Sequence, residues 1–423
     1  MLVILYGLSL LLRPPVFWGS AAVSALLVLL FGIGCVRLVP SLISLILGEE
    51  PHLRREGDRT FRRCGTRELF KLFLLILAVR LLEFPLTYIV HYALFGYSGT
   101  FFEIQRFWLD FYHPESAYPL FGYLSDVFWI VTVNFNHARF IGSYFFTALA
   151  ITALYYLVQV DFDRRTARRA VRYFLLMPFA ASLMGTVPDG LFVLFSVLAL
   201  LFIRKQRFVI ANLFAFFAVL THALGVLLFF PILAGYISYL IGNVRQNRET
   251  GKRYILRQAL NTLSFLLIPL GVGLVMLYSK HSFGDAMALY QLALGDNGVM
   301  IGSITEWTDE AFSLMRTVGG HSIAILLGKY AAQILYLLFA LVMLLFAGKT
   351  IPTSFALLMA VTLPLTVLTG HVSDTARIVT MTVPFVITLA AKVRHRWVDA
   401  LITVLLGAGW IAYFFAFVAG YTG

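Results

Sequence analysis

Two carboxylates in a stretch rich in aromatic residues are the first candidates for chemistry. Glu103 and Asp110 lie seven residues apart among Phe, Trp and Tyr side chains, within the segment FFEIQRFWLDFYHPESAYPLFGYLSD at 101–126. A helix through this segment would place both acids on one face. A carboxylate held against apolar rings has a raised pKa and can act as a general base. The aromatic residues by themselves are more typical of an anchor at a membrane interface.

Asp189 and Arg377, which lie much later in the chain, could both act on a charged substrate. Asp189 lies in a Pro-Asp-Gly turn, where it either lines a water-filled cavity or simply forms the turn. Arg377 begins an apolar stretch three residues after Asp374. An arginine at membrane depth is costly unless it is paired. Either Asp374 pairs with it, or it binds an anionic group such as a phosphate.

The amino-acid composition indicates that these candidate residues belong to a protein embedded in a lipid bilayer. Hydrophobic residues make up 60% of the 423 residues and charged residues 13%, and the mean hydropathy is +0.86. A soluble globular protein is nearer to half apolar and a quarter charged, so we predict an all-α polytopic membrane protein. The sequence has no Walker P-loop, dinucleotide glycine fingerprint, HExxH motif or nucleophile elbow. ATP-driven transport and metalloproteolysis are therefore disfavoured.

Apolar segments of the chain predict about twelve transmembrane helices, several of them close to the ~20 residues that a span needs. They lie near 17–47, 70–96, 139–160, 173–187, 189–203, 208–221, 223–241, 259–280, 321–347, 353–370, 378–392 and 398–420.

Basic residues orient these spans. Of the 33 Lys and Arg, 24 lie in alternate connections, which the positive-inside rule places in the cytoplasm. Only one span fits between the outer loop at 97–115 and the basic loop at 161–172. We assign it to 139–160, and we predict that 116–135 is an amphipathic or re-entrant part of the first outer loop. The net charge of +12 then reflects orientation and attraction to anionic lipids, and not nucleic-acid binding.

The opposite side of the membrane is acidic and rich in histidine. Eleven of the 21 acidic residues and seven of the nine histidines fall there, including His113 and His222. We expect the working face on this side, although outer loops that merely avoid Lys and Arg would give the same pattern. The chain divides into three parts: an N-terminal extension with one span and a basic loop at 1–68, a core at 69–258 with the outer catalytic loop 96–139, and a C-terminal helical part at 259–423 with the outer loop 280–320.

A series of short motifs follows a recognisable order along 70–240 and 370–390. They are Arg80-Leu81-Leu82, Tyr118-Pro119-Leu120-Phe121, the basic turn and apolar helix of Ala167–Ala180, Asp189-Gly190-Leu191-Phe192, Thr221-His222-Ala223-Leu224-Gly225, and Ala376-Arg377 ahead of Pro384-Phe385. This order resembles that of GT-C membrane glycosyltransferases, specifically the GPI mannosyltransferase 2 (PIG-V) family and its bacterial relatives. Asp189 stands where the family has a Glu, and His222 where it has an Arg.

The resemblance implies a GT-C-like fold and an inverting transfer of a sugar from a polyprenyl-phosphate donor to a lipid-linked or glycan acceptor. Glu103 is the best match to an Asp thought to be catalytic in the family's first outer loop, and Asp110 is the rival base. Arg377 would hold the phosphate. The other residues expected to bind substrate are Asp189, His222, Tyr118, His113 and Asp374. No metal site stands out in the sequence, although the outer His and Asp residues would accommodate a divalent cation.

We therefore expect a multi-pass protein of the plasma (inner) membrane in a bacterium, or of the endoplasmic reticulum in a eukaryote, with its active site on the non-cytoplasmic face. Its partners would be the sugar donor, the acceptor and membrane lipids, and no nucleic acid. The alternative is a lipid or solute transporter or flippase, whose polar residues would line a path across the bilayer. Few ionisable groups lie in midspan, and two of them, Arg80 and Glu83, have the i,i+3 spacing of a structural ion pair.

Overall fold

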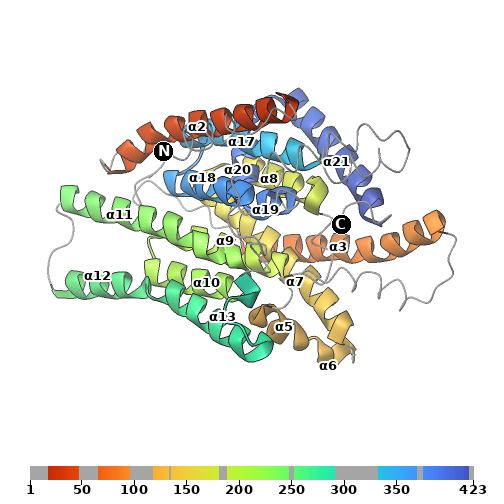
Figure 1. The fold of residues 1–423 in the computed structure, drawn as a ribbon, viewed down its shortest axis with the longest axis horizontal. Helices are drawn as coiled ribbons and strands as arrows, with labels where there is room; N and C mark the ends of the chain where they lie inside the picture. The colour runs from red at the N-terminus through yellow and green to blue at the C-terminus, as the bar shows by residue number, and fades with distance from the viewer. Residues whose placement is uncertain are drawn as a thin grey trace.

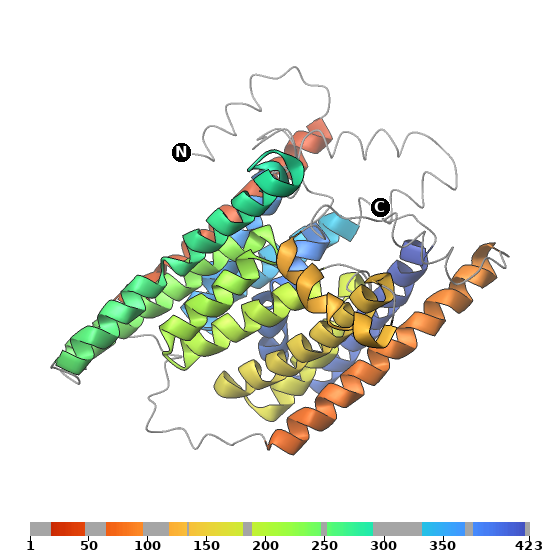
Figure 2. The same ribbon diagram turned by 90° about the horizontal axis from the view of Figure 1, so that it is seen from below.

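The computed structural model of the chain is built from α-helices, and the part that it describes contains no strand. The described residues are 18–46, 65–95, 118–132, 135–180, 188–246, 252–290, 332–368 and 375–418. In Figure 1, α2, α17 and α18 form an upper layer, α10–α13 lie together on the lower left, and α3 extends to the right. Figure 2 shows that most helices run roughly along one direction.

Several helices in the described part of the chain are long and apolar enough to cross a membrane. There are five, or six if a helix pair bent by 71° counts as one span. The five are Ala138–Asp161, Ala223–Val244, Tyr254–Phe283, Gln333–Thr350 and Arg396–Phe415, and the bent pair is Thr375–Met381 with Pro384–Lys392. In a bilayer every backbone polar group must be bonded internally, which a helix achieves within its own segment. The prediction of an all-α membrane protein is confirmed at this level.

Helices α7 (Phe135–Asp161) and α9 (Asp189–Arg204) form the centre of the bundle. Small side chains such as Ala148 and Ala199 are fully buried between helices, and small residues let helices approach closely in membranes. At the start of α9, a Cβ on Gly190 would overlap Oγ1 of Thr147 in α7. Only glycine therefore fits at this crossing without a shift of the backbone.

The described part of the predicted outer loop 96–139 contains two short helices, α5 (Pro119–Asp126) and α6 (Trp129–Thr132). Each is far shorter than the ~20 residues of a span, and both pack against α7. Phe121 is buried, whereas Tyr123 and Ile130 are exposed. The exposed residues are apolar, so the amphipathic or re-entrant character of 116–135 stays a prediction.

Helix α8 (Arg164–Leu176) differs from the span predicted near 173–187. Asp163 caps the helix by accepting a hydrogen bond from the Thr166 amide, and the helix ends ahead of Pro178. Burial alone would raise the pKa of Asp163, but hydrogen bonds from Thr166 outweigh it and keep the pKa below its usual value. The prediction followed the apolar run and overlooked the cap, which starts the helix among the arginines.

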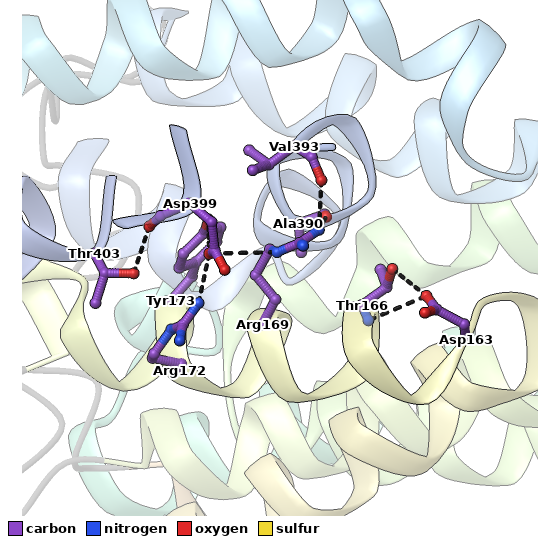
Figure 3. A network of polar contacts seen from close by, with 9 residues as sticks. All are labelled: Asp163, Thr166, Arg169, Arg172, Tyr173, Ala390, Val393, Asp399 and Thr403. Carbon is purple, nitrogen blue, oxygen red and sulfur yellow. Dashed lines mark hydrogen bonds and ion pairs between the residues drawn. The ribbon is translucent and has the colours of Figure 1, made fainter. Parts of the chain in front are cut away.

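The bent pair α19 (Thr375–Met381) and α20 (Pro384–Lys392) is a discontinuous helix. Pro384 supplies no backbone N–H and is tolerated at the first turn of the second half. All seven residues of α19 are buried. At the other end of the pair, the carbonyls of Ala390 and Val393 accept hydrogen bonds from Arg169 of α8, as Figure 3 shows.

The remaining helices surround this core. They are α2 (Trp18–Ile46), α3 (Thr66–Phe95), α10 (Phe208–Val219), η4 (Ala223–Leu228), α11 (Phe229–Gln246), α12 (Lys252–Ser264), α13 (Leu267–Phe283), α17 (Ala332–Thr350), α18 (Thr353–Leu368) and α21 (Arg396–Val418).

Candidate functional site

A buried ion pair joins two of the residues that the sequence singled out. Arg377 donates from Nε to Oδ2 of Asp189 and from Nη2 to Oδ1, both at 2.7 Å. Asp189 is 0% exposed and Arg377 5% exposed. Two parallel N–H···O bonds between charged groups fix the guanidinium plane as well as its position. The pair therefore orients both side chains.

The local sequence explains the position of each partner. Asp189 is the first residue of α9, where the positive end of the helix dipole stabilises a carboxylate. Arg377 lies in the middle of the short buried helix α19, whose contact with α9 brings the two charges together. The sequence predicted both as substrate-binding residues but did not predict that they pair with each other. Of the two partners considered for Arg377, Asp374 lies outside the described residues, and binding of an anion stays a prediction.

His222 contacts the first turn of α9, the helix that begins at Asp189. It caps η4 by accepting a hydrogen bond at Nδ1 from the Leu224 amide, at 3.0 Å. A neutral ring in this arrangement carries its proton on Nε2. The imidazole centroid lies 5.0 Å from that of Phe192, a residue on the first turn of α9. His222 is thus held in a fixed orientation and tautomer.

Tyr118, which belongs to the predicted outer loop 96–139, lies next to His222. Its ring stacks on His222 at 6.5 Å between centroids and meets Tyr290 edge-on at 6.4 Å. The Leu120 amide donates to the Leu220 carbonyl at 3.3 Å, which ties α5 to the end of α10. The structure therefore brings together Asp189, Arg377, His222 and Tyr118 at one end of the bundle. We call these four residues the outer polar cluster.

Tyr290 is a member of this neighbourhood that the sequence did not single out. Burial raises its pKa to about 12, so the phenol stays protonated near neutral pH. Its Oη has no hydrogen-bond partner among the residues that the structure describes. The only signal in the sequence was its place in the predicted outer loop 280–320. That signal does not separate it from other tyrosines in a chain that has 20.

The opposite end of α9 carries a second buried ion pair, which serves as a comparison. Arg204 Nη2 lies 2.6 Å from Oδ1 of Asp161 at the end of α7, and Nε lies 2.8 Å from Oδ2. Asp189 and Arg204 are fifteen residues apart on a helix of 16 residues, a separation of about 22 Å. Because Arg204 belongs to the basic connection at 204–207, this end is the predicted cytoplasmic one. The outer polar cluster then lies on the predicted non-cytoplasmic side.

Four predicted site residues cannot be assigned a place. Glu103, Asp110, His113 and Asp374 all lie outside the described residues. Within the described ranges, no group of three or more His, Cys, Asp or Glu side chains could hold a metal ion. The candidate site as described consists of an oriented cation, its carboxylate partner, an imidazole and two phenols. It can bind an anion or hydrogen-bond a polyol, and the proposed base must come from the outer loop.

Comparisons of the chain with protein-family models, with curated proteins and with solved structures give no match.

Proposed function

We propose that this membrane protein is a GT-C-like glycosyltransferase with about twelve spans. It would move a sugar, in the first instance mannose, from a polyprenyl-phosphate donor to a lipid-linked or glycan acceptor on the non-cytoplasmic face. The observation that carries the proposal is the buried Asp189–Arg377 pair next to His222 and Tyr118. Polar groups suited to a phosphate and a sugar gather there at the end of the bundle opposite to the basic loops.

The reaction would be a single inverting displacement. The acceptor hydroxyl oxygen bonds to the anomeric carbon while the bond from that carbon to the phosphate oxygen breaks. The electron pair leaves with the polyprenyl phosphate, and the hydroxyl proton passes to Glu103 or Asp110. A phosphate leaving group needs little protonation, so one base and one cation are sufficient. No further acid is required, in contrast to the two carboxylates of glycosidases.

Arg377 would contribute the cation, with Asp189 as its positioning residue. Asp189 engages Nε and Nη2, and a guanidinium has five N–H donors in one plane. A donor phosphate would share the Arg377 guanidinium with Asp189 by taking over part of the bond between them. His222 and Tyr118 would contact sugar hydroxyls or the acceptor. The buried pair is electrically neutral, so affinity for the phosphate would come from orientation more than from net charge.

A transporter is the second candidate, and two observations favour it. The pair α19 and α20 is discontinuous at Thr382 and Val383, and broken helices recur at the substrate sites of secondary transporters. In α3, Arg80 Nη1 binds Glu83 at 2.9 Å and the Ala180 carbonyl at 3.1 Å, with both charged side chains buried. Ionisable groups inside a membrane bundle often mark a transport path.

Sugar transfer by the purified protein tests the proposal. The protein would be reconstituted in vesicles and supplied with radiolabelled mannosyl-phosphoryl-polyprenol and a mixed lipid-linked glycan acceptor. We expect Glu103→Gln or Asp110→Asn to lower the rate at least 100-fold. Asp163→Asn is the matched carboxylate-to-amide control, because Asn caps a helix as well as Asp does.

Three outcomes decide between the proposals. Full activity of the double variant Glu103→Gln/Asp110→Asn would exclude both residues as the base. Absence of transfer from any polyprenyl-phosphate sugar, together with lipid or solute movement across protein-containing vesicles, would favour the transporter. Transfer by wild-type protein with loss in Arg377→Gln, and no lipid or solute movement, would support the enzyme.

A further inference from the structure

A second feature of the molecule is an apolar groove whose lining includes none of the four residues of the outer polar cluster. Side chains of α3, α7, α8 and α21 line it, and it encloses about 570 Å³. Pockets of this volume are of the size that holds small-molecule and lipid ligands. Nearly all of the lining is aliphatic or aromatic, with arginines from α8 on one side. The groove is separate from the proposed sugar site.

The groove has the depth of one membrane leaflet. On α3 it runs from Leu72 to Leu86, fourteen residues that rise about 21 Å along a helix. On α21, which begins at Arg396, it reaches Trp410 at the same height. The hydrocarbon core of a bilayer is about 30 Å thick, so the groove covers one half of it and part of a headgroup layer. Both helices start at basic loops, which places the groove in the cytoplasmic leaflet.

Positive charge exceeds negative charge at the cytoplasmic end. Arg168 and Arg172 of α8 line the groove. Arg168 is exposed and makes no hydrogen bond or ion pair with any described residue. Figure 3 shows that Arg172 and Arg169 share a single carboxylate, that of Asp399. A second acid, Glu68, accepts a hydrogen bond from Tyr155 of the lining and is paired with Arg164. Two acids therefore lie beside four arginines of α8, and this end of the groove carries a net positive charge.

The deep end of the groove is electrically neutral. Glu83 lines it, but Oε2 of this carboxylate is bound by Nη1 of Arg80 at 2.9 Å. A lipid chain that ends here meets no uncompensated charge. The gradient from a cationic mouth to an apolar, neutral interior matches a molecule with an anionic head and a hydrocarbon tail.

We propose that this groove binds an anionic glycerophospholipid of the cytoplasmic leaflet, with its phosphate at Arg168 and Arg172 and one acyl chain along α3. Arginine is suited to phosphate because its planar fork gives two hydrogen bonds at once. A zwitterionic lipid fills the same groove but carries no net charge to match the arginines. A long polyprenyl chain exceeds a groove that is one leaflet deep. The proposal does not depend on the enzymatic function.

Quenching of Trp410 fluorescence tests this site, because bromine atoms on an acyl chain quench an indole that they touch. The full-length protein would be placed in phosphatidylcholine vesicles that contain increasing fractions of dibrominated phosphatidylglycerol or dibrominated phosphatidylcholine. The Trp410 signal is the difference between wild type and Trp410→Phe. We expect half-maximal quenching at a mole fraction at least about fivefold lower for phosphatidylglycerol, given about 1 kcal/mol per basic residue at a membrane surface.

Arg168→Gln is the decisive variant, and Arg165→Gln is its matched control on an exposed position of α8 that does not line the groove. Arg168→Gln should raise the required fraction of phosphatidylglycerol about fivefold, and Arg165→Gln should leave it unchanged. Equal quenching by both lipids, or equal shifts in both variants, would overturn the site. Displacement by unlabelled polyprenyl phosphate at lower concentration than by unlabelled phosphatidylglycerol would overturn the choice of lipid.

A second measurement needs no tryptophan variant. Lipid that remains on the protein after detergent purification can be identified by mass spectrometry. Wild type and Arg165→Gln should retain anionic phospholipid, and Arg168→Gln should retain several-fold less. Equal retention by all three proteins would contradict the proposal.

Discussion

Separation of the Asp189–Arg377 pair tests both its structural and its functional importance. Asp189→Asn keeps the side-chain shape but removes the charge that faces a buried guanidinium. Loss of one partner of a buried pair costs about 3–5 kcal/mol. Asp189 is 0% exposed and Arg377 5% exposed, so solvent screening reduces this value little. A large chain loses about 2 °C of melting temperature per kcal/mol, so the melting temperature should fall by about 6–10 °C.

The double variant Asp189→Asn/Arg377→Gln distinguishes the energy of the ion pair from that of side-chain packing around it. A buried pair replaced as a whole by neutral groups costs far less than a broken one, so we expect the double variant to regain about half of the stability that Asp189→Asn loses. The assay is the fraction of monodisperse protein in detergent after heating, followed by size-exclusion chromatography. A double-mutant cycle on the two residues then gives their coupling energy.

The Asp161–Arg204 pair is a built-in control for function. It is also buried and bidentate, and it joins the opposite end of α9 to α7. Asp161→Asn should destabilise the protein to a similar degree but leave sugar transfer unchanged at a temperature where the variant is folded. Asp189→Asn should lower transfer at least tenfold at the same temperature, because Arg377 loses its orientation. Equal transfer by the two variants would refute a functional role for the outer pair, and a melting shift below 2 °C in Asp189→Asn would refute the reasoning about its energy.

Three further predictions follow from described contacts. Gly190→Ala should destabilise by about 1–3 kcal/mol because its Cβ would overlap Thr147, whereas Gly273→Ala, with open space around it, should not lower the melting temperature. Asp163→Ala should lower the free energy of unfolding by about 1 kcal/mol, and Asp163→Asn should change it almost not at all. The pKa of Asp163 is lowered in the folded protein, so the stabilisation by its charge is complete above the unfolded pKa of about 3.9 and is lost as the pH falls through the folded pKa. Melting curves recorded at several pH values would reveal this loss. Tyr290→Phe should leave the melting temperature within 1 °C, since its Oη has no partner among the described residues, and a fall in transfer would then report contact of this hydroxyl with substrate.

The class of fold could be predicted from the sequence because a protein that spans a bilayer needs an apolar composition. Composition can be counted without knowledge of any contact. A hydrophobic content of 60% and alternating basic loops were enough to predict an all-α membrane protein. Helix boundaries were less accessible. The start of α8 at Arg164 depends on one side-chain bond from Asp163 to the Thr166 amide. An average over an apolar window does not register such a bond, so the predicted segment began nine residues too late.

The site was readable in part for a related reason. A charged residue at membrane depth is expensive enough to stand out, and this singled out Arg377. Asp189 stood out through its Pro-Asp-Gly turn between short apolar segments. Their mutual pairing spans 188 positions, and no local pattern predicts which acid an arginine will meet. Tyr290 could not be recognised at all, since an aromatic residue in an outer loop is ordinary until its neighbours Tyr118 and His222 are known. The base, Glu103 or Asp110, is still a prediction from the sequence.

The two ion pairs of α9 bear on the choice between enzyme and transporter. A transporter with alternating access must open each end of its bundle in turn. Here α9 is held at one end through Asp189 to α19 and at the other through Arg204, whose partner Asp161 ends α7. Opening either end by separating these helices would break a buried pair, and loss of one partner of such a pair costs about 3–5 kcal/mol. An enzyme gains from the same rigidity, because reacting groups held in place lose less entropy on reaching the transition state. The arrangement therefore favours the glycosyltransferase proposal over the transporter.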